Sequence, residues 1–174
     1  MKIAGFLCSR NCVENGMLRN CLTSLSLTTD MIFVYDDAST EPVRPIYEEF
    51  DCIVLYGAVN AFHLELKHKQ ELLQVALRHR PDWLVWIDSD ALLGWHFEDR
   101  ARTEHTLEQC EANEIELLHL HNCNLWRSPW WYRTDQEFDN LWHGVFWRNT
   151  GELHYAPVGK LHQKQYPLFH HDLN

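Results

Sequence analysis

The first half of the sequence alternates short apolar runs with stretches in which apolar residues recur at helical spacing. Four runs have the apolar content of buried strands: Lys2–Cys8, Met31–Tyr35, Cys52–Tyr56 and Trp83–Ile87. Between them, residues 15–27 and 66–79 show the periodicity of helices, and residues 41–50 predict a short helix or turn. Because the apolar runs are continuous and alternate with helices, the pattern predicts an α/β fold with a mostly parallel central sheet covered on both faces.

The second half is less regular. Residues 102–114 predict a polar helix, and Ile115–His121 predicts a fifth strand. Residues 144–156 carry turn-forming residues around Gly151 between two apolar stretches, which predicts a β-hairpin. The sequence holds no repeat, low-complexity segment or linker, so its 174 residues predict a single domain, 1–174.

Composition and charge exclude several classes of protein. The net charge is −10 and no cluster of Lys and Arg occurs, which argues against a nucleic-acid-binding surface. No apolar run approaches the roughly 18 residues of a membrane span, and the apolar start of the chain is too short for a signal peptide. We therefore expect a cytoplasmic protein with no transmembrane segment. The six cysteines form no Cys-x-x-Cys pair, which favours reduced, buried thiols over a zinc site.

Polar segments follow three of the four predicted strands of the first half. They are "CSRN" (8–11), "DDAST" (36–40) and "DSD" (88–90). In sheets of parallel strands, ligands bind at the carboxyl ends of the strands. The pattern therefore predicts that these three segments lie on one rim of the sheet.

Asp88 and Asp90 are the strongest candidates for a metal site. In an extended segment, alternation sends both side chains to the same side. Two close carboxylates repel unless a cation or a proton lies between them, and Mg²⁺ or Mn²⁺ held by one or two carboxylates and substrate phosphates meets this need. The alternative is that Asp88 caps the following turn and Asp90 is solvated. The position after the fourth strand favours the metal.

The segments after the first two strands are candidates for nucleotide contacts. Asp36 and Asp37 could accept hydrogen bonds from ribose hydroxyls or base N–H groups. The alternative is an Asx-turn in which Ser39 or Thr40 caps the next segment. Ser9 and Arg10 either touch the nucleotide or belong to an ordinary loop.

No glycine-rich phosphate loop occurs anywhere in the sequence. Phosphate charge would therefore be met by a metal ion and by single cations. Arg10, Lys67 and Lys69 are the candidates, although the two lysines also fit the charged face of a helix.

The aromatic segment 126–147 suits sugar rings, which have an apolar C–H face, but its tryptophans equally suit core packing. Asp135, Glu137 and Asp139 lie in this segment, and one of them could act as a general base on an acceptor hydroxyl, the alternative being solvated loop charges.

Histidines are numerous towards the end of the chain. A histidine of the tail, His162 or His170, could fold back onto the metal of the Asp-x-Asp pair, or could be an ordinary surface residue. The sequence assigns no function to His68, His119 and His121.

Together, "CSRN", "VYDDAST" and "DWLVWIDSDAL" resemble the nucleotide-sugar glycosyltransferases of the GT-A fold, in particular family 2. The resemblance implies a three-layer, Rossmann-like α/β fold, with a nucleotide-binding half (1–95) and an acceptor-side half (96–174). It implies Mn²⁺ or Mg²⁺ at Asp88 and Asp90, with His162 or its rival His170 completing the metal shell. The predicted nucleotide-binding residues are Cys8, Ser9, Arg10, Asp36, Asp37, Ser39, Lys69 and Ser89.

The function that this resemblance implies is transfer of a sugar, with inversion, from a nucleotide-sugar donor such as a UDP-sugar. The acceptor would be a hydroxyl of a glycan, a lipid-linked molecule or a protein. The sequence lacks the family's usual form of the base motif, which leaves Asp135, or its rivals Glu137 and Asp139, as the base.

The main alternative is a non-catalytic sugar-binding or nucleotide-binding module with the same fold. An Asp-x-Asp phosphatase is disfavoured because its motif would follow an early strand, and a nucleotidyltransferase because its glycine-rich loop is missing.

Overall fold

The computed structural model describes residues 1–14, 16–125, 133, 142–151 and 153–155. These residues form six strands, four α-helices and a 3₁₀ helix. The elements are β1 (Ile3–Ser9), α1 (Met17–Ser26), β2 (Met31–Asp36), α2 (Arg44–Glu49), β3 (Ile53–Tyr56), η1 (Phe62–Leu64), α3 (Glu65–Arg78), β4 (Trp83–Trp86), α4 (Arg100–Ala112), β5 (Leu117–His121) and β6 (Trp142–Arg148).

One mixed sheet runs through both halves of the chain, in the order β3-β2-β1-β4-β6-β5. Strands β1, β2, β3 and β4 are parallel to one another, and β6 is antiparallel to both β4 and β5, the strands on either side of it. The predicted, mostly parallel sheet is therefore confirmed. The chain leaves β1 towards β2 on one side and later returns to pair β4 on the other, so the strand order reverses at β1. Such a reversal is where ligands bind in open α/β sheets.

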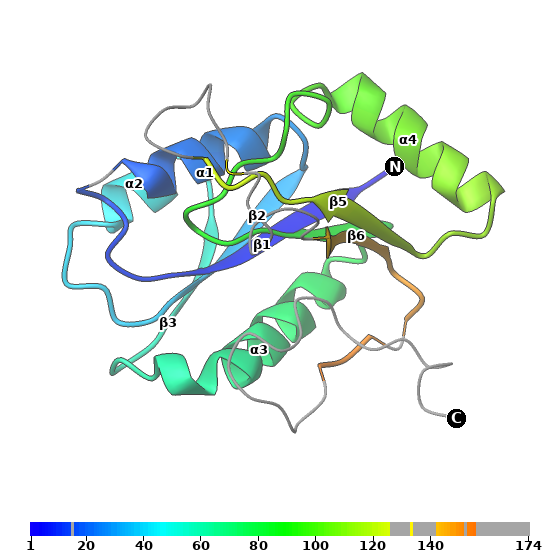
Figure 1. The fold of residues 1–174 in the computed structure, drawn as a ribbon. Coiled ribbons are helices and arrows are strands. Elements are labelled where there is room, and N and C mark those ends of the chain that lie inside the picture. Colours follow the sequence, from blue (N-terminus) through cyan, green and yellow to red (C-terminus); the bar gives the residue numbers. More distant parts are fainter. Residues whose placement is uncertain (15, 126–132, 134–141, 152, 156–174) are drawn as a thin grey trace.

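Helices cover both faces of the sheet, which makes three layers. Figure 1 shows α1, α2 and α4 on one face and α3 on the other. Along β1, Ile3 and Leu7 pack into the core on the first face, whereas Ala4 and Phe6 pack into the core under α3. Burial on both faces explains why the strands are continuous apolar runs in the sequence.

The predicted hairpin at residues 144–156 is wrong in its second arm. Its first arm belongs to β6, which already has β4 on one edge and β5 on the other, so no edge remains for a returning strand. Leu153 and Tyr155 instead pack into the core on the α3 face, and the Tyr155 N–H donates to Gln70 Oε1 at 2.6 Å.

Among the described residues, no helix combines the length and apolar character that crossing a membrane requires.

Gly5 lies on β1 close to α1 and the turn that follows this helix. A Cβ atom at this position would lie 3.0 Å from Leu25 Cδ2 and 3.1 Å from Thr29 Cγ2. Both distances are tighter than ordinary van der Waals contact, so β1 needs a residue without a side chain here.

We expect Gly5→Ala to lower the free energy of unfolding by about 1–2 kcal/mol, because the added methyl group overpacks the contact between β1 and α1. Gly94→Ala is the matched control, since no atom of the described residues lies within 4 Å of a Cβ at that position. Urea unfolding followed by circular dichroism measures both variants, and equal midpoints for the two would contradict this account of the packing.

Candidate functional site

The three polar segments predicted to share a rim do lie together. The Asp37 N–H donates to the Ser9 carbonyl oxygen at 2.9 Å, and the Asn11 N–H donates to Ser39 Oγ at 3.1 Å. In return, Asn11 Oδ1 accepts from the backbone N–H of Thr40 at 2.8 Å. These bonds join the loop after β1 to the loop after β2, which follows from the parallel register that brings both strands to an end at Ser9 and Asp36.

The loop after β4 is held against the same region. Cys12 Sγ and Ser89 Oγ lie 3.4 Å apart, and Cys21 Sγ of α1 donates to the Asp88 carbonyl oxygen at 3.5 Å. The Asp-x-Asp segment is not extended, contrary to the prediction, because the Ala91 N–H closes a turn onto the Asp88 carbonyl oxygen at 2.9 Å. The two carboxylates nevertheless line one cavity.

That cavity, called the rim cavity below, has a volume of about 330 Å³. It is lined by Cys8, Ser9, Arg10, Cys12, Asp37, Phe62, Glu65, His68, Trp86, Asp88, Ser89 and Asp90. Seven of the predicted site residues are therefore brought together: Cys8, Ser9, Arg10, Asp37, Asp88, Ser89 and Asp90. Asp88 and Asp90 are exposed, so both carboxylates are available to a ligand.

Asp36 and Asp37 have different surroundings. Asp36 is buried, and its two oxygens accept from the Ser39 N–H and the Tyr47 hydroxyl, each at 2.9 Å. Asp36 and Ser39 line a neighbouring depression rather than the rim cavity. The bond between them is of the side-chain-to-backbone kind considered for this segment, with the Asp36 carboxylate rather than the Ser39 hydroxyl as the capping group. Asp37 Oδ1 accepts from the Ala61 N–H at 2.9 Å, whereas its buried Oδ2 has no hydrogen-bond partner among the described residues.

Lys69 does not line the rim cavity, contrary to its predicted contact with phosphate. Its side chain is 1% exposed, and its Nζ lies 2.8 Å from Glu65 Oε1. Lys67 is exposed beside Glu71, as expected for a charged helix face. Arg10 is thus the cation that lines the cavity, and no carboxylate of the described residues lies within ion-pair distance of it.

Cys8, which lines the rim cavity, lies among several charged side chains. Burial raises the pKa of the Cys8 thiol far above its ordinary value; Lys69 opposes this increase, and the carboxylates of Glu65, Asp88 and Asp37 add to it. Cys8 therefore stays a neutral thiol and is not a nucleophile, because the thiolate is the reactive form.

His68 is a second neutral group in the lining of the rim cavity. Its ring stacks on Tyr35 with centroids 4.1 Å apart, and burial lowers its pKa, which favours the uncharged imidazole. His68 therefore offers the cavity a hydrogen-bonding group that carries no charge at neutral pH.

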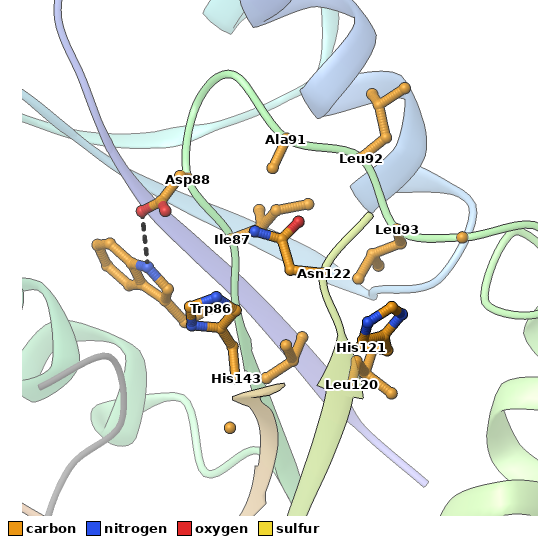
Figure 2. A pocket seen from close by; sticks show the side chains of 13 residues that line it. Trp86, Ile87, Asp88, Ala91, Leu92, Leu93, Leu120, His121, Asn122 and His143 are labelled. Carbon is orange, nitrogen blue, oxygen red and sulfur yellow. Dashed lines mark hydrogen bonds between the residues drawn. The ribbon is translucent and has the colours of Figure 1, made fainter. Parts of the chain in front are cut away.

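A second cavity of about 160 Å³, whose lining is drawn in Figure 2, shares Trp86 and Asp88 with the rim cavity. Its apolar wall comes from the end of β4 and the loop that follows, and its polar groups are His121, Asn122 and His143. The sequence had given no function to His121 and had not singled out Asn122 or His143. His143 reaches this cavity because β6 pairs with β5, which places His143 opposite Leu120. The sequence does not reveal this pairing.

The site's carboxylates suit a hard divalent ion. Exposed oxygen donors at Asp88 and Asp90 match the ligands that Mg²⁺ and Mn²⁺ prefer. The described residues contain no group of three or more His, Cys, Asp or Glu side chains that could hold a metal ion. Two carboxylates still suffice when a substrate's phosphates supply further ligands. The predicted base candidates Asp135, Glu137 and Asp139, and the tail ligands His162 and His170, lie outside the described residues.

Comparison with solved structures shows the GT-A fold. A structure of S. aureus TarS 1–349 aligns with 74% of this chain and 39% of its own, at 16% identity and a TM-score of 0.53. The structure of TarS 1–349 in complex with UDP-GlcNAc aligns with 74% of this chain and 38% of its own, at 16% identity and a TM-score of 0.54. A further TarS structure aligns with 74% of this chain and 24% of its own, at 17% identity and a TM-score of 0.54. This chain therefore spans well under half the length of these structures. No protein-family model and no curated protein matches it.

We expect Tyr47→Phe to lower the free energy of unfolding by about 1–3 kcal/mol, because it leaves a buried oxygen of Asp36 without its donor. Burial raises the pKa of Tyr47 well above its ordinary value, with Asp36 adding to the increase, so the hydroxyl remains a donor at neutral pH. Tyr56→Phe is the control, since Tyr56 is 48% exposed. Chemical unfolding compares the two, and a loss no larger for Tyr47 than for Tyr56 would contradict the role given to this bond.

Proposed function

We propose that this chain transfers a sugar from a nucleotide-sugar donor, with a UDP-sugar as the first candidate, to an acceptor hydroxyl, using Mn²⁺ or Mg²⁺. The observation that carries the proposal is the convergence of Asp37, Asp88, Asp90 and Arg10 on one cavity at the strand-end rim of a GT-A sheet. The similar fold of TarS, which has been crystallised with UDP-GlcNAc, supports the choice of donor.

The donor's nucleoside and diphosphate are assigned to different parts of the rim. Asp37, whose Oδ2 lacks a partner among the described residues, would accept a hydrogen bond from a ribose hydroxyl or a base N–H. Arg10 would donate to the diphosphate, because a guanidinium carries several donors that suit phosphate oxygens. Asp36 would act through the loop that it holds, with Ser39 as its backbone partner.

Asp88 and Asp90 would hold the metal ion. When bound, such an ion neutralises negative charge that develops on a leaving nucleoside diphosphate. His162, or its rival His170, is the proposed third ligand. Tyr155, which precedes this tail, is buried in the core on the α3 face of the sheet. The seven residues from Tyr155 to His162 can span about 24 Å when extended.

The second cavity is the proposed place of the acceptor hydroxyl. It shares Asp88 with the rim cavity, so an acceptor there would lie next to the donor's diphosphate. Asp135, or Glu137 or Asp139, is the proposed base that removes the hydroxyl proton as the oxygen attacks the anomeric carbon. Attack on the face opposite the leaving group would invert the configuration at that carbon.

A non-catalytic module that binds a nucleotide-sugar is the second candidate. It is favoured by the sequence's lack of the usual form of the base motif of this family. Donor binding without hydrolysis or transfer across a broad panel of acceptors would support this candidate, and slow hydrolysis of the donor would count against it.

We expect a UDP-sugar to raise the temperature of unfolding only when Mn²⁺ or Mg²⁺ is present, because a ligand that binds the folded state stabilises it. At a donor concentration about one hundred times its Kd, the gain in unfolding free energy is about 2.7 kcal/mol. A thermal-shift panel of UDP-, GDP- and dTDP-sugars, with and without Mn²⁺, makes this measurement. No shift with any donor would contradict both candidate functions.

In a separate test, we expect Asp88→Asn to weaken binding of the donor with Mn²⁺ by about tenfold or more, since it removes a charged metal ligand. Asp51→Asn makes the same change of charge at an exposed residue just before β3, away from the strand-end rim, and serves as the control. Calorimetry measures both variants. Equal affinity of Asp88→Asn and the unsubstituted chain in Mn²⁺ would rule out the proposed metal role.

A further inference from the structure

Trp86 links the buried side of α3 to the exposed carboxylate of Asp88. Its side chain is 4% exposed and lines both cavities. Its indole Nε1 donates to Asp88 Oδ1 at 3.2 Å, which Figure 2 shows as a dashed line. Among the described residues, no other hydrogen bond to the Asp88 side chain occurs. The orientation of this carboxylate therefore depends on one buried ring.

A buried cation lies against the same ring. Lys69 Nζ is 4.3 Å from the centroid of the Trp86 ring, and Glu65 Oε1 is 2.8 Å from that Nζ. The exposed fractions of the Lys69 and Glu65 side chains are 1% and 5%, so both charges are shielded from water and from salt. A cation on the face of an indole attracts the ring's electrons, and hydrogen-bonded groups in series polarise one another. Lys69 therefore strengthens the N–H that Asp88 accepts.

We propose that Trp86, with the Lys69–Glu65 pair behind it, is a positioning residue that holds Asp88 in the orientation used to bind the cation and diphosphate. The inference rests on the proposed function for its purpose, but the interaction itself does not depend on a ligand. It gives Lys69 a role different from the direct contact with phosphate that the sequence suggested. Partners in this second layer around a metal-binding side chain commonly change metal affinity or activity by about 10–100-fold when they are removed.

Trp83 provides a control on the same strand. It is fully buried, and its Nε1 donates to Glu111 Oε1 at 2.8 Å, so it too joins a buried indole to a carboxylate. It lies on the other face of the sheet and lines neither cavity. Replacing either ring by phenylalanine removes an N–H and leaves an aromatic group in place.

The first measurement needs no metal or nucleotide. Indole N–H signals in a ¹H–¹⁵N spectrum report the hydrogen bond of each tryptophan. We expect Asp88→Ala to shift the Trp86 signal and speed its hydrogen exchange, while the Trp83 signal stays in place. An unchanged Trp86 signal would overturn the proposal, because it would show that Asp88 is not held by this N–H.

The second measurement uses UDP-GlcNAc with MnCl₂ as the probe. We expect Trp86→Phe to weaken its binding by about tenfold, and Trp83→Phe to change it less than about twofold. The double variant Glu65→Gln/Lys69→Met removes the cation without leaving an unpaired buried charge, and we expect it to weaken binding by about threefold. Unfolding midpoints of each variant show whether the fold is kept.

The outcomes separate this inference from the proposed function. Equal binding by Trp86→Phe and Trp83→Phe, with both variants folded, would overturn the positioning role. Failure of the unsubstituted chain to bind this probe or any other nucleotide-sugar of the panel would instead contradict the proposed function, and the indole signals would then decide alone whether Trp86 holds Asp88.

Discussion

The constraint on which the rest of this structure depends is the coverage of a parallel sheet on both faces. Helices on the two faces leave the core strands nothing polar to contact along their length, so polar chemistry is confined to the strand ends. The register that ends β1 at Ser9 and β2 at Asp36 brings the loops after these strands together. The bonds through Asn11 then fix the loops against each other, and the end of β4 completes the cavity.

The electrostatics of the cavity follow from that confinement. Asp37, Glu65, Asp88 and Asp90 gather at one place in a chain whose net charge is already −10. Lys69 compensates part of this charge from inside, but it is committed to Glu65 and the Trp86 ring. The exposed carboxylates of Asp88 and Asp90 are left to be compensated from outside, which a divalent cation and the donor bound to it would do.

Much of this arrangement is readable in the sequence. The continuous apolar runs predict β1 to β4, and the strand-end rule then predicts the shared rim, because both depend on local composition and on a general property of parallel sheets. The hairpin prediction was wrong because β6 pairs with β4 and β5 on its two edges, and this long-range pairing cannot be read from local sequence. The sequence did not predict His143 as a site residue, because its place in the second cavity depends on the pairing between β5 and β6. For Lys69, a signal existed: Glu65, His68 and Lys69 continue the helical face of Leu72, Leu73 and Ala76. When the buried face of a helix is polar in its first turns and apolar afterwards, the polar turns indicate a site at that end of the helix.

The most direct test of the central claim is where Mn²⁺ binds in the presence of UDP. Paramagnetic Mn²⁺ broadens the amide signals of nearby residues in a ¹H–¹⁵N spectrum. The account predicts selective broadening at Arg10, Ser89 and Asp90 on the rim. The amide signals of the depression at the other end of β4, whose lining includes Asp82, Glu108 and Glu111 together with Arg80 and Arg148, should remain sharp. Broadening centred on that depression, or no site-specific broadening at all, would contradict the assignment of the rim as the binding site.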